Sequence, residues 1–163
     1  MSRIEARLAE LGLQLPPPLV APPGVVLPFA FAQRAGRRVL IAGHGPQGPD
    51  GRLAGPFGKV GAEVDVAAAR HAAMLTGLSM LASVRAEIGD LDRITGWRRV
   101  FGMVASAPGF QDQPGVINGF SELIHAVFGP AVGRHVRSAV GMAELPWNIP
   151  VEIEGELAID GGD

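Results

Sequence analysis

Apolar residues recur with two different periods along the chain, and the change of period divides it into helices and strands. In residues 64–88, Ala67, His71, Met74, Leu78, Leu81 and Ile88 follow steps of three, four and seven, while Arg70, Ser79, Ser83 and Glu87 lie away from that stripe. This spacing predicts an amphipathic helix that ends at Gly89. Residues 116–128 predict a second helix that ends at Gly129-Pro130, with its inner side formed by Ile117, Phe120, Ile124, Val127 and Phe128.

Other segments have the composition and alternation of β-strands. Residues 25–34 and 39–42 predict two strands joined by a turn at 35–38. Residues 93–106 predict another strand, and since both alternating faces are apolar from Val100 onward, we expect it to be covered on both sides. Residues 136–143 and 151–159 predict a C-terminal hairpin, whose connection contains Pro146 and Pro150.

The N-terminal segment precedes this pattern. Ser2 and Glu5 have the spacing of a capping box at the start of a short helix, and a proline-rich extended segment follows. We therefore expect residues 1–24 to form an N-terminal helix and Pro-rich segment, and residues 25–160 to form one domain. The element order predicts an α+β fold with a single mixed β-sheet and two main helices on one face. The other face also needs a cover, and a second copy of the sheet predicts a symmetric oligomer.

Composition narrows the class of protein. The 163 residues are 47% hydrophobic and 18% charged, with a net charge of −2, so there is no basic field for nucleic acid. The chain has no cysteine, which excludes disulfides and thiolate chemistry. Its apolar runs are too short for a membrane span, and its N-terminus does not have the pattern of a signal peptide. We expect a cytoplasmic protein with no membrane or nucleic-acid partner.

Candidate chemistry is concentrated near the C-terminus. Arg137 is a guanidinium among small and aliphatic neighbours, and Glu152, Glu154 and Glu156 form a carboxylate row on one face of the last strand. Each has an ordinary alternative, because a strand arginine is commonly ion-paired and strand carboxylates commonly face solvent. The glycine-dense loop at 43–51 lets backbone N–H groups approach a ligand, but it does not match a nucleotide-binding motif. The histidines lack metal-ligand spacing, so we expect no metal.

Several motifs resemble the Rid/YjgF family, also known as L-PSP endoribonuclease-like or chorismate-mutase-like proteins. They are Arg137-Ser138-Ala139-Val140, Leu145-Pro146, Val151-Glu152-Ile153-Glu154, Ile41-Ala42-Gly43-His44-Gly45-Pro46 and Asn118. The resemblance covers roughly residues 25–160, and it is greatest to the longer branch of the family. It implies a homotrimer, with the sheets as a central barrel, the helices outside, and ligand clefts between subunits.

The resemblance also implies an activity. Family members with the strand arginine hydrolyse reactive 2-imino and enamine acids to 2-oxo acids and ammonia without a cofactor. Arg137 matches the carboxylate-binding arginine, Glu152 matches the acidic residue that positions or activates water, and Asn118 matches a cleft residue. The remaining expected substrate-binding positions are Phe29, Ala42, Gly43, His44 and Ala139. Phe29, Ala42 and Ala139 depart from the family pattern, since Tyr, Ser and Cys are common there.

Strand geometry bears on how such a site is assembled. If Ala143 lies opposite Pro150 in the predicted hairpin, Arg137 and Glu152 are roughly 13 Å apart within one chain. That separation is too great for a small acid, so we expect the two residues of one site to come from different subunits. An alternative function is a non-catalytic trimeric protein that binds a small carboxylate, which the polar losses at Phe29, Ala42 and Ala139 favour. Ribonuclease activity is the weakest alternative, because the chain is acidic and lacks a general acid–base pair of histidines.

Overall fold

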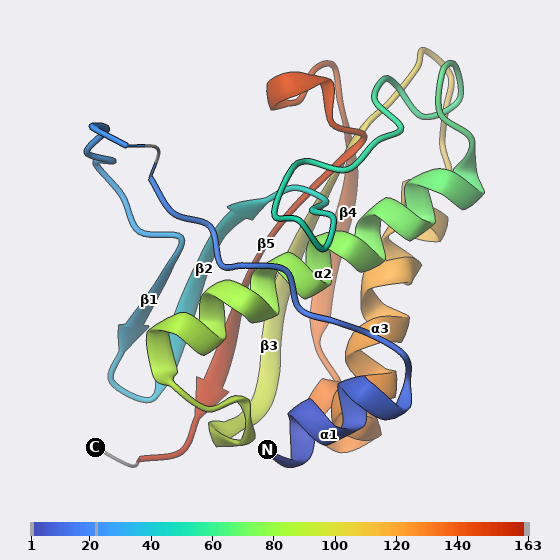
Figure 1. The fold of residues 1–163 in the computed structure, drawn as a ribbon. Helices are drawn as coiled ribbons and strands as arrows, with labels where there is room; N and C mark the ends of the chain where they lie inside the picture. Colours follow the sequence, from blue (N-terminus) through green and yellow to red (C-terminus); the bar gives the residue numbers. More distant parts are fainter. Residues whose placement is uncertain (1, 22, 162–163) are drawn as a thin grey trace.

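The computed structural model describes residues 2–21 and 23–161, which form one layer of helices against one face of a five-stranded sheet (Figure 1). The strands are β1 (Ala32–Ala35), β2 (Arg38–His44), β3 (Ile94–Ala105), β4 (Val136–Met142) and β5 (Val151–Ile159). The helices are α1 (Arg3–Glu10), α2 (Val66–Ile88) and α3 (Gln113–Gly133), with short 3-10 turns at Leu91–Arg93 and Pro146–Asn148. The predicted α+β fold with a single mixed sheet is confirmed.

The strand order is β1-β2-β5-β3-β4, which corrects the predicted C-terminal hairpin. The strands β4 and β5 are not paired, because β3 lies between them, parallel to β4 and antiparallel to β5. The physical reason is the crossover through α3. A strand, a helix and a second strand connected in this way place the two strands parallel and side by side. The last strand then returns on the far side of β3.

The first predicted strand is much shorter than expected. Residues 25–31 are not in the sheet, and β1 begins only at Ala32, where its ladder with β2 begins. A neighbouring apolar run therefore stays outside the sheet, and part of it lines a cavity described below. The turn between β1 and β2 lies where it was predicted.

Helix α2 is buried over more of its circumference than a simple apolar stripe predicts. Leu78, Leu81 and Ile88 are buried as expected, but Ala67 and His71 are exposed. Ser79 and Ser83, predicted to lie away from the core, are buried because the segment after β2 crosses that side of the helix. Ser79 contacts the Gln47 side chain there, and Ser83 donates to His44.

Helix α3 packs tightly against α2 and carries the predicted inner face. A Cβ on Gly119 would overlap the backbone carbonyl of Arg70, so only glycine allows this approach. The helical backbone is interrupted at Gly129, near the predicted end, but a further turn continues to Gly133.

Helix α1 has the predicted capping box at Ser2 and Glu5. Its first backbone N–H groups also donate to the Asp92 carboxylate at 2.8 Å, and Ile4 and Leu8 are buried in the main core. Among the described residues, no helix is both long and apolar enough to cross a membrane.

The second face of the sheet carries no helix (Figure 1). Along β3, Val100 and Val104 are fully buried under the helices, whereas Phe101 and Met103 point to the open face and are only half-buried. The expectation that this strand is covered on both sides therefore holds for only one side within a single chain. Leu40 adds a further exposed apolar side chain to the open face.

Candidate functional site

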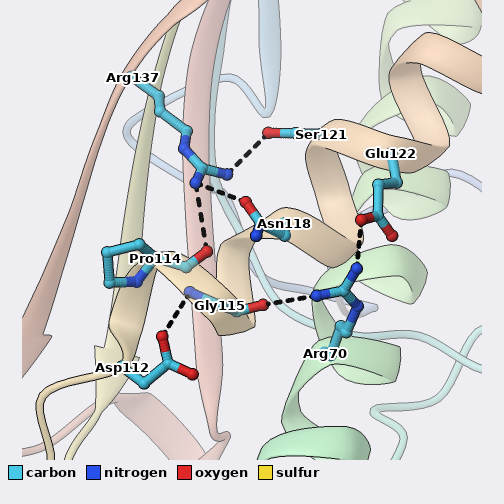
Figure 2. Close-up of polar contacts among 8 residues, drawn as sticks. All are labelled: Arg70, Asp112, Pro114, Gly115, Asn118, Ser121, Glu122 and Arg137. Atoms are coloured by element: carbon cyan, nitrogen blue, oxygen red, sulfur yellow. Dashed lines mark hydrogen bonds and ion pairs between the residues drawn. The ribbon is translucent and has the colours of Figure 1, made fainter.

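Arg137 lies on the edge strand β4 and points toward the first turns of α3 (Figure 2). Its Nη2 donates to the Asn118 Oδ1 at 2.6 Å and to the Pro114 carbonyl at 3.2 Å, and its Nη1 donates to the Ser121 Oγ at 2.9 Å. Pro114, Asn118 and Ser121 are four and three residues apart, so they share one face of the helix. The guanidinium is therefore held in one orientation.

The charge of Arg137 is not neutralised by these contacts, because all three acceptors are neutral. In the part of the chain that the structure describes, no carboxylate pairs with Arg137, and two of its five N–H donors have no acceptor. Partial burial lowers the pKa of Arg137, but an arginine remains a cation at neutral pH. Such a group is suited to binding an anion from outside the chain.

Arg70 provides a contrast on the other side of α3 (Figure 2). It donates to the Gly115 carbonyl at 3.2 Å and forms an ion pair with Glu122. Both arginines contact the same helix, but the charge of Arg70 is already matched within the chain. Arg137 therefore differs from Arg70 in that no described carboxylate pairs with it.

The N-terminus of α3 is fixed by Asp112, whose carboxylate accepts from the Gly115 N–H at 3.1 Å. Asn118 lies in the second turn of this helix. Its side chain is free to orient Arg137.

A chain of hydrogen bonds continues behind Arg137. The Ser121 hydroxyl lies 3.0 Å from the His135 Nε2, and the His135 Nδ1 lies 2.7 Å from the Gly133 carbonyl. Since a carbonyl only accepts, the Nδ1 carries the proton and the Nε2 accepts from Ser121. Burial, together with the charges of His125 and Arg137, lowers the pKa of His135, which favours this neutral form. Sequence reasoning missed Ser121 and His135, although the spacing of Ser121 from Asn118 was a usable signal.

Glu152 belongs to a second cluster on the open face of the sheet. It pairs with Met103 in the ladder between β5 and β3, and no hydrogen bond or ion pair to another described residue holds its carboxylate. Burial, with a further contribution from the charge of Glu154, raises the pKa of Glu152. A Cβ on Gly43 would overlap this carboxylate, so the absence of a side chain at position 43 makes room for it.

Glu152 and Gly43 border a cavity of about 530 Å³ that is lined mainly by apolar side chains. Phe29 and Phe31 contribute from the segment before β1, and Trp147 and Ile149 contribute from the connection before β5. Phe29, Gly43 and Glu152, which were predicted as site residues from distant parts of the sequence, therefore lie around one cavity. The contribution of the apolar segment that precedes Phe29 was not predicted.

A β-bulge determines where His44 points. Between Ile41 and His44, β2 has one more residue than the facing part of β5, so both Ile41 and His44 lie on the helix-covered face. His44 is buried, with its Nδ1 2.7 Å from the Ala42 carbonyl and its Nε2 2.9 Å from the Ser83 Oγ. The expected ligand contact of His44 must be corrected, because its ring faces the core and its polar atoms are already bonded there.

The other two predicted positions, Ala42 and Ala139, lie in different surroundings. Ala42 is half-buried and lines a second depression on the open face together with Phe101 and Glu154. Ala139 lies two residues beyond Arg137 on β4 and packs against the core. Neither provides a polar side chain.

Arg137 and Glu152 are on opposite faces of the sheet within one chain. Arg137 pairs with Val100, and Glu152 pairs with Met103, three residues further along β3 and on the other side of it. The separation of their Cα atoms is roughly 14 Å from standard strand spacings. The predicted site residues therefore form two separate groups, the Arg137 group and the Glu152 cavity. Within the described residues, no cluster of three or more His, Cys, Asp or Glu suits a metal ion.

Comparison with known proteins finds relatives that match nearly the full length of this chain, although no family model matches it. Protein TCP17 of Trypanosoma cruzi is 35% identical over 158 residues, which span 97% of this chain and 95% of that protein. The crystal structure of Atu1372 from Agrobacterium tumefaciens, a protein of unknown function, is 42% identical with a TM-score of 0.84. That match covers 96% of this chain and 92% of the other.

Two further structures are described as putative endoribonucleases. A protein of Shewanella oneidensis MR-1 described as a "putative endoribonuclease" is 26% identical, with a TM-score of 0.86 and coverage of 96% of this chain and 99% of that one. A "putative endoribonuclease L-PSP" of Entamoeba histolytica shares the fold at 20% identity and a TM-score of 0.54, over 89% and 94% of the two chains. The agreement of fold, motif positions and relatives places this chain in the Rid/YjgF family of L-PSP endoribonuclease-like proteins.

Proposed function

We propose that this protein hydrolyses reactive 2-imino acids, and the enamines in equilibrium with them, to 2-oxo acids and ammonia. The observation that carries the proposal is the half-buried Arg137, oriented by three neutral acceptors and left without a carboxylate partner among the described residues. A guanidinium with unused donors binds a substrate carboxylate and fixes the adjacent carbon. A 2-imino acid has its C=N bond on that carbon.

For this reaction the protein needs only to orient the substrate and the water and to transfer a proton. Water adds to the carbon of the C=N bond, its proton passes to the nitrogen, and the resulting tetrahedral adduct collapses to a C=O bond with loss of ammonia. Glu152 has a raised pKa and an unpaired carboxylate, which suit it to accept and return that proton. Every atom of the product comes from the substrate and one water, so the reaction needs no cofactor.

The site requires a second subunit, because Arg137 and Glu152 do not meet within a chain. We place each site between the Arg137 group of one copy and the Glu152 cavity of its neighbour in a homotrimer. The open sheet face, with half-buried Phe101 and Met103 and exposed Leu40, supports such an assembly by offering apolar surface for a neighbour to cover. A solution mass near three times the 17.0 kDa chain mass is expected by light scattering, and a monomer at working concentration would contradict this assembly.

The decisive experiment follows the loss of 2-iminopropionate generated in situ. We expect Arg137→Ala to reduce kcat/KM at least 100-fold, and Arg137→Lys to recover only part of it because an ammonium lacks the planar fork. Arg70→Ala is the matched control, since Arg70 contacts the same helix but is already ion-paired. Equal turnover by wild type and Arg137→Ala would refute the proposal.

Shared sites can be tested by mixing two inactive variants. Arg137→Ala and Glu152→Gln should each be inactive alone, and co-folding them in equal amounts should restore about a quarter of wild-type activity if each site takes one residue from each of two subunits. Absence of any recovery in mixed oligomers of confirmed composition would show that both residues act within one chain.

A second function is binding of a small carboxylate without turnover. It is favoured by Phe29, Ala42 and Ala139, none of which has a polar side chain. In that case, calorimetry should detect 2-oxo acid binding that depends on Arg137, while the imine decays at its uncatalysed rate.

A further inference from the structure

The cavity beside Glu152 is much more apolar than binding of a small polar acid requires. Most of its lining is apolar, and it includes Val25, Leu27, Phe29, Trp147 and Ile149. The polar side chains in the lining are Glu152 and Gln47, and Gln47 is engaged by Ser79 and by the Gly51 carbonyl. Among the described residues, Glu152 is thus the only ionisable group that lines it.

Much of this lining comes from the segment before β1, which the sheet itself does not need. Val25 and Leu27 lie outside any strand, yet they extend an apolar wall above the bulge of β2. The volume of about 530 Å³ falls within the range of small-molecule sites, which combine apolar walls with a few polar groups. The methyl or ethyl group of a small imino acid would leave most of these walls without contact.

The rim of the cavity holds a strained aromatic residue. Trp147 has φ of 53°, a conformation that bulky residues seldom adopt, and the residue is 79% exposed. The turn is held by hydrogen bonds from the Ile149 N–H to the Pro146 carbonyl and from the Gly58 N–H to the Asn148 carbonyl. The backbone thus keeps a large apolar ring at the opening of the cavity, where its own chain buries little of it.

We infer that this cavity accepts a large apolar substituent, branched aliphatic or aromatic, on the 2-imino acid or 2-oxo acid ligand. The inference rests on the proposed function, since the carboxylate of such a ligand would be bound by Arg137 of the partner subunit. The substituent lies against Phe29, Leu27 and Trp147, and the reacting carbon lies near Glu152. The substrate class is therefore imino acids with side chains the size of those of leucine or phenylalanine.

The test compares imino acids generated in situ by an amino-acid oxidase from leucine, phenylalanine and alanine. We expect kcat/KM to be at least tenfold higher for the two large imines, because each buried methylene in an apolar pocket contributes roughly tenfold. Val25→Trp fills the cavity and should lower kcat/KM for the large imines at least tenfold more than for the alanine-derived imine. Val26→Trp is the matched control, because Val26 is 94% exposed, is not part of the lining and should leave both values unchanged.

Direct binding separates failure of this inference from failure of the proposed function. Calorimetry with 4-methyl-2-oxopentanoate, phenylpyruvate and pyruvate measures the preference without turnover. Similar kcat/KM for large and small imines, with no selectivity change in Val25→Trp, would overturn the inference and leave the hydrolase proposal standing. Absence of turnover, with binding that favours the large acids at least tenfold and weakens in Val25→Trp, would support the inference and overturn the hydrolase. Neither turnover nor binding of any acid would overturn both.

Discussion

The two faces of the sheet are built by alternate residues of the same strands, yet their surroundings differ. On the helix-covered face, Val100 and Leu157 are fully buried against α2 and α3. On the open face, Phe101 and Met103 are half-buried beside the carboxylate row of β5. The covered face accounts for the stability of one chain. The open face combines uncovered apolar surface with the Glu152 carboxylate, which no described residue pairs.

Val100 and Phe101 are neighbours on β3 and lie on opposite faces of the sheet, so substitutions of these two residues test the two faces separately. Val100→Ser places a hydroxyl in the fully buried core and leaves a void, so we expect the free energy of unfolding to fall by about 3 kcal/mol. The measurement is urea denaturation, at one chain concentration because assembly adds to apparent stability. A loss below about 1 kcal/mol would mean that the covered face is not the main core.

Phe101→Ser should act on assembly instead of on the fold. Phe101 points to the open face, and we expect the serine variant to shift from about three times 17.0 kDa to the mass of one chain, with its circular dichroism unchanged. Light scattering across a concentration series measures the shift. If the mass stays the same, the open face around Phe101 is not the contact surface.

The Glu152 cavity can be disturbed by a single methyl group. In Gly43→Ala, the new Cβ would overlap the Glu152 carboxylate, which must then move, and we expect turnover to fall about tenfold with little loss of stability. The control is a double-mutant cycle with Glu152→Gln. If Gly43→Ala acts through the carboxylate, it should cause no further loss in the Glu152→Gln background. Additive losses would place its effect elsewhere.

The buried His44 should make the covered face sensitive to acid. Burial lowers the pKa of His44, so below about pH 6.5 the unfolded chain binds a proton that the native chain does not. Its contribution to stability is thus complete above that pH and decreases as the pH falls through it. We expect the urea midpoint to decrease from pH 7.5 to pH 5.5 and His44→Gln to flatten this dependence. His135 acts in the same direction, so the double variant should be flatter still, and an unchanged slope would contradict the assignment.

The smallest expected effect concerns the rim of the cavity. Trp147→Gly and Trp147→Ala remove the same exposed indole, but only glycine adopts a φ of 53° without strain. We expect the glycine variant to be about 1 kcal/mol more stable than the alanine variant by thermal unfolding. Equal stability would show that the turn relaxes when the indole is removed, and that the indole itself holds the conformation.

Sequence patterns predicted the elements better than their pairing. The periodic apolar residues of α2 and α3 and the alternation in β3 depend on local geometry, and the structure confirms all three elements. The hairpin of β4 and β5 was wrong because strand neighbours depend on the crossover through α3, not on proximity in the sequence. The strand–helix–strand order of residues 94–142 was the signal that could have indicated a parallel pair.

The two groups of site residues were only partly predictable for the same reason. Arg137 and Asn118 were named from sequence motifs, but their contact depends on the packing of α3 against β4. The three-residue spacing of Ser121 from Asn118 indicates one helix face, but it identifies Ser121 as a contact only once Arg137 is known to lie against that face. The inward orientation of His44 follows from the bulge in β2, and no residue type in the sequence predicts that bulge.

Because of that bulge, the backbone around the cavity mouth can change while the core stays the same. The extra residue lies between Ile41 and His44, and those two side chains already face the same partner strand two positions apart. Deleting Ala42 would therefore leave both of them in register, while it straightens the strand and moves the backbone that borders Glu152. An insertion or deletion of one residue at this point can alter the edge that borders the cavity while the buried face remains intact. Relatives with a different length here would be expected to share this core and differ in the shape of the cavity mouth.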